Sequence, residues 1–192
     1  MAKKNTQDPS QMKRGLPYYY GMLDQVIGMR KDFLKNKDIA MWLMFGIVKR
    51  YLEAVIEATE NDGPMIATWY GNAPEIPAAM GIVQTGPGNM LIQHNDENVK
   101  HARQSQTPGN SCGLLRISVS AVEQGLTPTP KAIIAMLEPC DGQTTAAEMW
   151  QKTPEWRDLP QFGLDAPYGN SEEDIEHFAD ELRRLYGLIR AE

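Results

Sequence analysis

Two cysteines carry the most chemically informative pattern in this 192-residue sequence. Cys140 follows the apolar run 132–137 and precedes Asp-Gly-Gln-Thr-Thr, which predicts a cysteine in the turn between a buried strand and a helix. Thr145 and Glu148 have the spacing of a capping box, so we expect this helix to begin at Thr145. A cysteine in such a turn faces the positive end of a helix dipole, which favours a thiolate acting as nucleophile or metal ligand.

Cys112 has a similar placement, because it follows Pro-Gly-Asn-Ser and precedes an apolar stretch. A helix is expected from Cys112 to about Glu123, capped by Asn110 or Ser111 and ended by Gly125. Unpaired N–H groups at helix starts suit an anionic iron–sulfur cluster held by thiolates. Two thiolates complete neither such a cluster nor a closed zinc site, however, so the alternative that both cysteines are buried packing residues stays open.

Glu75 is a third candidate site residue. It follows Pro74 in a turn after a predicted strand at 65–70, where it can reach the same face as Cys140 and act as an acid or base. Its alternative role is that of an ordinary glutamate in the first turn of a helix. We expect the histidines to be solvated side chains rather than ligands: His94, His101 and His177.

Several classes of function have no support in the sequence. Gly86-Pro87-Gly88 lacks the Gly-Lys-Ser/Thr of a phosphate-binding loop, and no dinucleotide fingerprint, nucleophile elbow or His-Glu-x-x-His is present. The formal charge of -6 argues against nonspecific nucleic-acid binding. The longest apolar run, 39–48, is too short to span a membrane and predicts a buried helix. The polar N-terminus does not resemble a signal peptide, so we expect a cytoplasmic location with reduced thiols.

The expected elements change character near residue 62. Residues 1–20 are expected to form an extended lead-in, and 21–61 two helices, the second capped by Asp38. Residues 94–110 are expected to form a polar connection ending in a loop. Strands and helices alternate after residue 62: strands at 65–70, 82–83, 89–92, 132–137 and 162–165, and helices at 76–80, 112–123, 145–151 and from 171 onward.

Such alternation predicts an α/β fold, a parallel sheet flanked by helices of the Rossmann-like or flavodoxin-like kind, with an N-terminal helical appendage. We divide the chain into an N-terminal extension and helical cap, 1–62, and an α/β domain, 63–192. Ligands of parallel sheets gather beyond the carboxyl ends of the strands. The turns at 71–75, 139–144 and 165–168 are therefore expected to converge at one edge.

The turn segments together resemble a known family. Residues 139–150, Pro-Cys-Asp-Gly-Gln-Thr-Thr-Ala-Ala-Glu-Met-Trp, are similar to the cysteine segment of the 2-hydroxyacyl-CoA dehydratase and benzoyl-CoA reductase family. Residues 71–82 resemble its Pro-Glu turn, and 165–168 its Asp-x-Pro strand end. Cys112 falls where the family places its first cluster cysteine. Order and spacing agree over about 64–190.

The resemblance implies a concrete chemistry. Family subunits hold a 4Fe-4S cluster through three cysteines, leave one iron open, and pair with a homologous subunit. A separate ATP-dependent activator injects one electron, the acyl-CoA thioester becomes a ketyl radical anion, and the hydroxyl group then leaves. Benzoyl-CoA reductases use similar parts to reduce an aromatic ring. By position, Cys112 and Cys140 would be cluster ligands, and Glu75 would face the substrate and assist proton transfer or hydroxyl departure.

The sequence also departs from the family. Family subunits have a second α/β domain that supplies the third cysteine, so 63–192 is expected to be the first of two such domains and the third ligand to come from elsewhere. Ile76 replaces the second glutamate that is common after the Pro-Glu pair. Three alternatives stay open: a benzoyl-CoA reductase subunit, a non-catalytic α/β partner subunit, and a thiol redox protein forming a Cys112–Cys140 bond.

Overall fold

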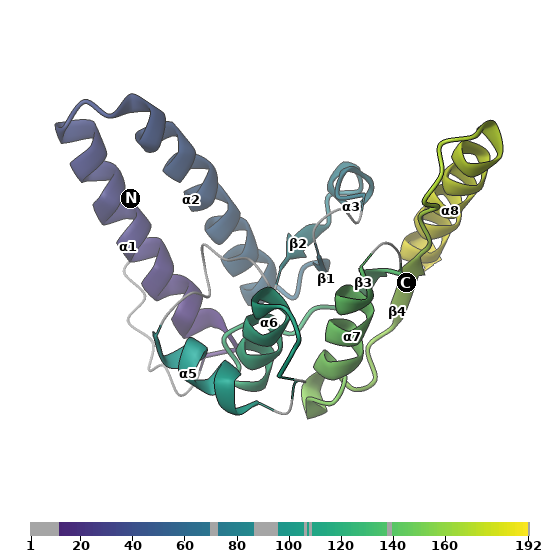
Figure 1. Ribbon diagram of the computed structural model, residues 1–192. Helices are drawn as coiled ribbons and strands as arrows, with labels where there is room; N and C mark the ends of the chain where they lie inside the picture. The colour runs from purple at the N-terminus through teal and green to yellow at the C-terminus, as the bar shows by residue number, and fades with distance from the viewer. Residues whose placement is uncertain are drawn as a thin grey trace.

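A four-stranded parallel sheet forms the centre of the protein, with helices on both faces (Figure 1). The computed structural model describes residues 12–69, 73–86, 96–105, 107, 109–137 and 140–191. The strands, in spatial order β2-β1-β3-β4, are β1 (Met65–Thr68), β2 (Val83–Thr85), β3 (Ala132–Met136) and β4 (Gln161–Leu164). The predicted α/β class and parallel sheet are confirmed, while the strand expected at 89–92 lies outside the described residues.

The helices complete the alternation that the sequence predicts. They are α1 (Leu16–Lys35), α2 (Ile39–Glu60), α3 (Glu75–Ala79), α5 (Asp96–Gln104), α6 (Gly113–Glu123), α7 (Asp141–Trp150), the 3-10 helix η2 (Pro154–Trp156) and α8 (Glu172–Ala191). None of the described helices is long and apolar enough to cross a membrane. Asp38 caps α2 as expected, because its carboxylate accepts a hydrogen bond from the Met41 amide over 3.1 Å.

The alternating side chains of β3 separate two apolar layers. Ile133 and Ala135 join the layer formed with α6 and α7, whereas Ile134 and Met136 join the layer that contains residues of α8. All five residues of β3 are buried, because the strand pairs with β1 on one side and β4 on the other. Since all four strands are parallel, their carboxyl ends share one edge of the sheet.

A long helical hairpin, α1 and α2, packs at its base against β1 and β2. The buried hydroxyl of Tyr19 lies 3.2 Å from that of Thr85, and Leu52 and Val55 are fully buried nearby. Burial of Tyr19 raises its pKa well above the usual range of a phenol. The expected extended lead-in over 1–20 is therefore wrong from Leu16 onward, since the aromatic segment belongs to α1.

The start of α1 explains this correction. Gly15 has φ 79°, and an added Cβ would lie 2.5 Å from the Pro128 nitrogen, so only glycine fits this turn. Pro17 then stands in the first turn of the helix, where its missing N–H costs no helical hydrogen bond. Apolar burial of the tyrosine segment therefore extends α1 five residues beyond the predicted start at 21.

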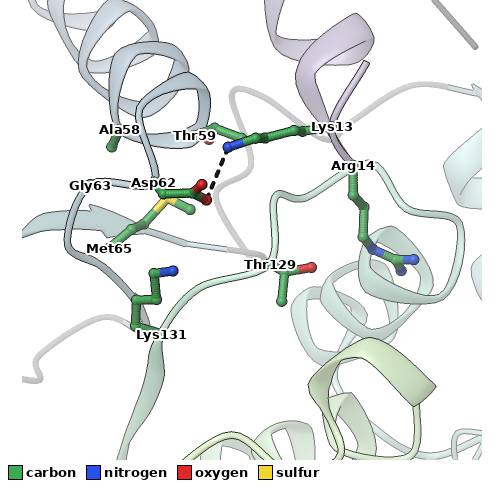
Figure 2. Close-up of a pocket in the computed structure, with 9 residues that line it drawn as sticks. All are labelled: Lys13, Arg14, Ala58, Thr59, Asp62, Gly63, Met65, Thr129 and Lys131. Atoms are coloured by element: carbon green, nitrogen blue, oxygen red, sulfur yellow. Dashed lines mark ion pairs between the residues drawn. The ribbon is translucent and has the colours of Figure 1, made fainter. Parts of the chain in front are cut away.

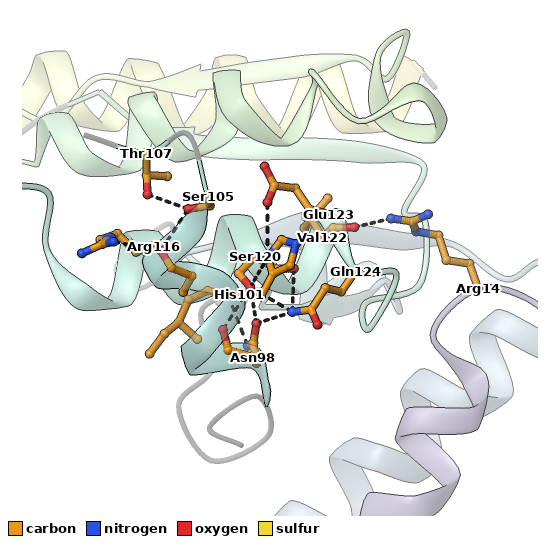
Figure 3. A network of polar contacts seen from close by, with 12 residues as sticks. Arg14, Asn98, His101, Ser105, Thr107, Arg116, Ser120, Val122, Glu123 and Gln124 are labelled. Atoms are coloured by element: carbon orange, nitrogen blue, oxygen red, sulfur yellow. Dashed lines mark hydrogen bonds and ion pairs between the residues drawn. The ribbon is translucent and has the colours of Figure 1, made fainter. Parts of the chain in front are cut away.

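Helix α5 was not anticipated, because 96–104 contains mostly polar residues. It docks on α6 through Asn98, which is fully buried (Figure 3). Ser120 Oγ donates to Asn98 Oδ1 over 2.5 Å, and Gln124 Nε2 donates to the same oxygen over 2.8 Å. His101 Nδ1 lies 2.9 Å from Ser120 Oγ and 3.6 Å from a carboxylate oxygen of Glu123. A polar network thus replaces the apolar stripe by which a docked helix is usually recognised.

Helix α8 is tied to the carboxyl end of β4. Arg184 Nη2 donates to the Gly163 carbonyl and to Glu181, each over 2.6 Å, and the amide of Asp165 donates to Glu181 over 3.2 Å. The hydrogen bond from Arg184 lowers the pKa of Glu181 to about 2. At the helix start Ser171 and Asp174 form reciprocal hydrogen bonds, which confirms the predicted beginning of this helix.

We predict that Ser120→Ala lowers the free energy of unfolding by about 1–3 kcal/mol, because it leaves buried polar partners in α5 and α6 unsatisfied. Urea unfolding followed by circular dichroism measures this change. Ser111→Ala is the matched control, since Ser111 makes no hydrogen bond to the described residues. Equal stability of the two variants would contradict the structural role of the network.

A second prediction concerns acid stability. The pKa of Glu181 is depressed from 4.5 to about 2 in the folded chain, so its stabilising contribution is present above pH 4.5 and is lost as the pH falls toward 2. Glu181→Gln should therefore flatten the decline of stability in this pH window, measured by thermal unfolding at successive pH values. Glu57→Gln, an exposed change on α2, should leave the decline intact.

Candidate functional site

Cys140 stands directly at the start of α7, as its N-cap residue. The helix begins at Asp141, so the predicted start at Thr145 is wrong. Thr145 does not cap the helix, because its hydroxyl donates back to the Asp141 carbonyl over 2.9 Å within the first turn. A negative side chain at Asp141 suits a first helical turn, which explains the earlier start. Pro139 lies outside the described residues.

Cys112 occupies the same position on α6. It is the N-cap residue with extended backbone angles of φ -60° and ψ 146°, and Gly125, with φ 72°, follows the end of the helix as predicted. The expected capping by Asn110 or Ser111 is wrong, since no side chain caps this helix. Both cysteines are therefore the residues from which their helices begin.

The first turns of α6 and α7 lie next to each other at the carboxyl edge of the sheet. Both helices belong to the same apolar layer, α7 begins after β3, and α6 leads back into the beginning of β3. A Cβ added at Gly142 would lie 3.4 Å from Cys140 Sγ and 3.6 Å from Leu115 Cδ1, so the first turn of α7 borders Leu115 in the first turn of α6. Because Gly142 has no side chain, the space beside Cys140 Sγ stays unfilled.

Both thiols are exposed and neither forms a disulfide. The alternative that these cysteines are buried packing residues is therefore wrong. No side chain caps either helix, so first-turn N–H groups of two helices stand beside two accessible sulfur atoms. Backbone N–H donors and helix dipoles favour negative charge, which is the requirement of a thiolate ligand set and of an anionic iron–sulfur cluster.

The described part of the chain does not contain a complete metal site. No group of three or more His, Cys, Asp or Glu side chains in it is arranged to hold a metal ion. The whole sequence has two cysteines, so sulfur from this chain can fill at most two positions of a cluster. Any further ligand would have to be another residue type or come from outside this sequence.

Glu75 is the first residue of α3, which packs in the α8 layer rather than in the layer of α6 and α7. It borders an open cavity of about 470 Å³ together with Ile76, Met80 and Tyr186. The structure thus places Glu75 after the carboxyl end of β1 in an apolar pocket, while its predicted catalytic role stays a prediction. Residues 71 and 72 of the expected Pro-Glu turn, and residue 70 of the strand expected before it, lie outside the described residues.

A polar group at the end of β4 was only partly visible in the sequence. The sequence identified Asp165 as a strand-end residue. The structure adds His177, because its Nε2 lies 3.3 Å from the carboxylate of Asp165. Both side chains are about half exposed. Glu181 and Arg184 complete the group through their contacts with β4. Their spacing of three residues on a predicted helix is the sequence feature that could have indicated this ion pair.

The opposite, amino edge of the sheet holds a separate pocket of about 260 Å³ (Figure 2). Lys13 Nζ lies 2.9 Å from the Asp62 carboxylate, and its hydrogen bond lowers the pKa of Asp62. Lys131 points into the same pocket from the start of β3. Because this pocket lies beyond the amino ends of β1 and β3, it is not continuous with the cysteine edge.

Comparison with known proteins identifies the family of the chain. The family model described as "2-hydroxyglutaryl-CoA dehydratase, D-component" matches residues 70–190, a span that contains Glu75 and both cysteines. No curated protein matches the chain. The matched span covers more than half of the sequence and includes three of the four strands of the sheet. The chain therefore belongs to the 2-hydroxyglutaryl-CoA dehydratase D-component family.

Proposed function

We propose that this chain is an iron–sulfur-binding component of a multi-subunit enzyme that dehydrates a 2-hydroxyacyl-CoA to an enoyl-CoA. The observation that carries this proposal is the placement of two exposed cysteines, Cys112 and Cys140, at the starts of adjacent helices within the family span. The family description names a dehydratase, which favours dehydration over the aromatic ring reduction of benzoyl-CoA reductases.

Cys112 and Cys140 fit two of the ligand positions of a cluster site. Their sulfur atoms are accessible, the helix starts are uncapped, and Gly142 keeps the space beside Cys140 free of a larger side chain. A 4Fe-4S cluster, when bound, would supply one-electron chemistry at low potential. The protein would contribute thiolate ligands and N–H donors to the cluster sulfur atoms, which tune its potential.

The missing ligand defines the partners that the proposal needs. Two cysteines leave the ligand set incomplete, so a homologous subunit, or protein beyond this sequence, would supply the third cysteine. An ATP-dependent activator would deliver the electron, and the acyl-CoA would bind at the carboxyl edge of the sheet, where parallel sheets bind their ligands. The location in the cell that fits these partners is the cytoplasm.

Glu75 is the proposed acid or base. It is a carboxylate at a pocket whose other lining residues are Ile76, Ala79, Met80 and Tyr186, which are mainly apolar. An acyl group with a hydroxyl substituent matches such a mixed surface, because the chain packs on carbon while the hydroxyl reaches the carboxylate. The role of Glu75 would be to hold or transfer the proton that accompanies hydroxyl departure.

Cluster binding is tested by anaerobic reconstitution of the full chain together with its homologous subunit. Cys112→Ser and Cys140→Ser should each weaken iron binding by about 10–100-fold or more, because each removes a direct ligand. Iron and sulfide content, visible absorbance and electron paramagnetic resonance measure this loss without requiring activity. Ser111→Ala, beside Cys112, is the matched control and should retain full iron content.

Unchanged iron content in Cys140→Ser would overturn the cluster proposal. If the wild-type chain instead forms a reversible Cys112–Cys140 disulfide and binds no iron, the thiol redox alternative replaces it. Mass spectrometry of peptides after oxidation and alkylation separates these two results.

The role of Glu75 is tested with the assembled enzyme and a 2-hydroxyacyl-CoA substrate. Glu75→Gln should lower kcat by about 10²–10⁴-fold while iron content stays normal, because only proton transfer is removed. Glu57→Gln, an exposed change on α2, is the control. A rise in KM with unchanged kcat would show that Glu75 binds substrate without transferring a proton, which contradicts the assignment.

A further inference from the structure

The outer half of the α1–α2 hairpin projects away from the rest of the chain (Figure 1). Every buried residue of the two helices lies near the sheet, up to Val26 in α1 and from Leu52 in α2. None of the residues 27–51 is buried, so the prediction of a buried helix from the apolar run 39–48 is wrong for this part of α2. A two-helix projection of this kind has no apolar core of its own, so its order depends on contacts along its inner side.

Side chains on the facing sides of α1 and α2 contact each other and hold the two helices together. Phe33 and Phe45 pack with their ring centroids 5.2 Å apart. The guanidinium of Arg30 lies 4.5 Å from the centroid of the Trp42 ring and donates a hydrogen bond to the Trp42 carbonyl over 3.1 Å. The outer side of the hairpin is therefore a defined surface.

This outer side is unusually apolar for a surface. Ile39, Leu43 and Ile47 recur every fourth residue on α2 and are 51%, 56% and 72% exposed. Large exposed apolar side chains cluster here more densely than elsewhere in the described chain, and we call the following residues the hairpin patch: Met29, Leu34, Ile39, Leu43, Met44 and Ile47. A surface with so many exposed large apolar side chains marks an interaction site.

The half of the hairpin that contains the hairpin patch has a positive net charge. Residues 27–51 contain six Lys and Arg and two Asp, a formal charge of +4 in a chain of net charge -6. Four of these cations form no ion pair with the described residues: Lys31, Lys35, Lys37 and Arg50. A partner for this surface should therefore be apolar at its centre and acidic around it.

The beginning of α8 has that complementary chemistry. Residues 172–182 contain six Asp and Glu and no Lys or Arg. Ile175, which lies among these acidic residues, is 63% exposed, and Tyr168, which precedes the helix, is 77% exposed. We call the following residues the α8 patch: Tyr168, Glu172, Glu173, Ile175 and Glu176. The three glutamates of this patch form no ion pair within the described part of the chain.

The two patches of one chain cannot meet. The hairpin packs against β1 and β2 at one end of the sheet, whereas α8 packs against β4 at the other end. Figure 1 shows the hairpin and α8 as two separate arms on either side of the sheet. Contact between the patches therefore requires two molecules.

We infer that the hairpin patch of one copy packs against the α8 patch of a second copy, with the reciprocal contact formed at the same time. Each copy has both surfaces, so a two-fold arrangement makes the contact twice. Two contacts of about 600–1,000 Å² each reach the roughly 1,200–2,000 Å² of a standard specific interface. Pairing of hairpin with hairpin is disfavoured, because it would bring two charges of +4 together.

This inference goes beyond the proposed function and does not depend on it. The hairpin, 16–60, precedes the residues that the family model matches, and no cysteine lies in either patch. Loss of dimerisation would leave the cluster proposal standing, and failure of cluster binding would leave the dimer standing.

Sedimentation equilibrium of the full chain tests the inference. We expect a dimer at low salt whose dissociation constant rises by about tenfold or more at 1 M salt, where the Debye length falls to about 3 Å. Leu43→Ser/Ile47→Ser should give a monomer with unchanged circular dichroism, because the outer half of the hairpin does not support the sheet. A monomeric wild-type chain at low salt would overturn the inference.

Charge reversal provides the sharper test. Lys31→Glu/Lys35→Glu/Arg50→Glu should be monomeric, and so should Glu172→Lys/Glu173→Lys/Glu176→Lys. An equimolar mixture of the two should form a heterodimer, because one copy then has two acidic patches and the other two basic patches. The matched control, Lys100→Glu/Arg103→Glu/Lys152→Glu, changes charge on α5 and after α7 and should remain a dimer.

Two results would contradict the second copy as the occupant. If the charge-reversed variants stay dimeric, the dimer uses another surface. If the wild-type chain is monomeric and floats with vesicles of phosphatidylserine and phosphatidylcholine, while the Leu43→Ser/Ile47→Ser variant does not, the hairpin patch binds an anionic membrane surface instead.

Discussion

The parallel pairing of β3 with both of its neighbours is the constraint on which the other layers depend. The strand is buried on both faces, because its alternating side chains pack against the α6–α7 layer on one face and against the α8 layer on the other. Since parallel strands need crossover connections, each strand is followed by a helix that begins at the carboxyl edge. The accessible sulfur atoms of Cys112 and Cys140 lie at that edge for this reason.

The carboxyl edge has two sides with different chemistry. On the α6–α7 side, two uncapped helix starts and two thiols favour an anionic cofactor, whereas on the α3–α8 side Glu75 borders an apolar pocket. The proposed dehydration would use both kinds of surface, one for the cluster and one for the acyl group. The α1–α2 hairpin lies apart from them at the β2 end of the sheet, where it is available for association.

Local patterns predicted elements well where one residue type dominates. The apolar run of β3, the recurring apolar positions of α8 and the cap at Asp38 are all confirmed. Patterns failed where burial comes from distant partners. Helix α5 needs no apolar stripe, because Asn98 docks it on α6 through hydrogen bonds, and α1 begins before the predicted residue, because Tyr19 is buried against Thr85 in the edge strand β2.

The sequence by itself determined the parallel α/β class, the family, and the two cysteines at helix starts, since periodicity, turn residues and motif spacing are local properties. Only the tertiary structure decided that α6 and α7 begin side by side, that both thiols are exposed, and that Glu75 packs in the other layer. The physical reason is that spacing along the chain fixes which residues begin a helix, whereas packing on the two faces of β3 fixes which helix starts become neighbours.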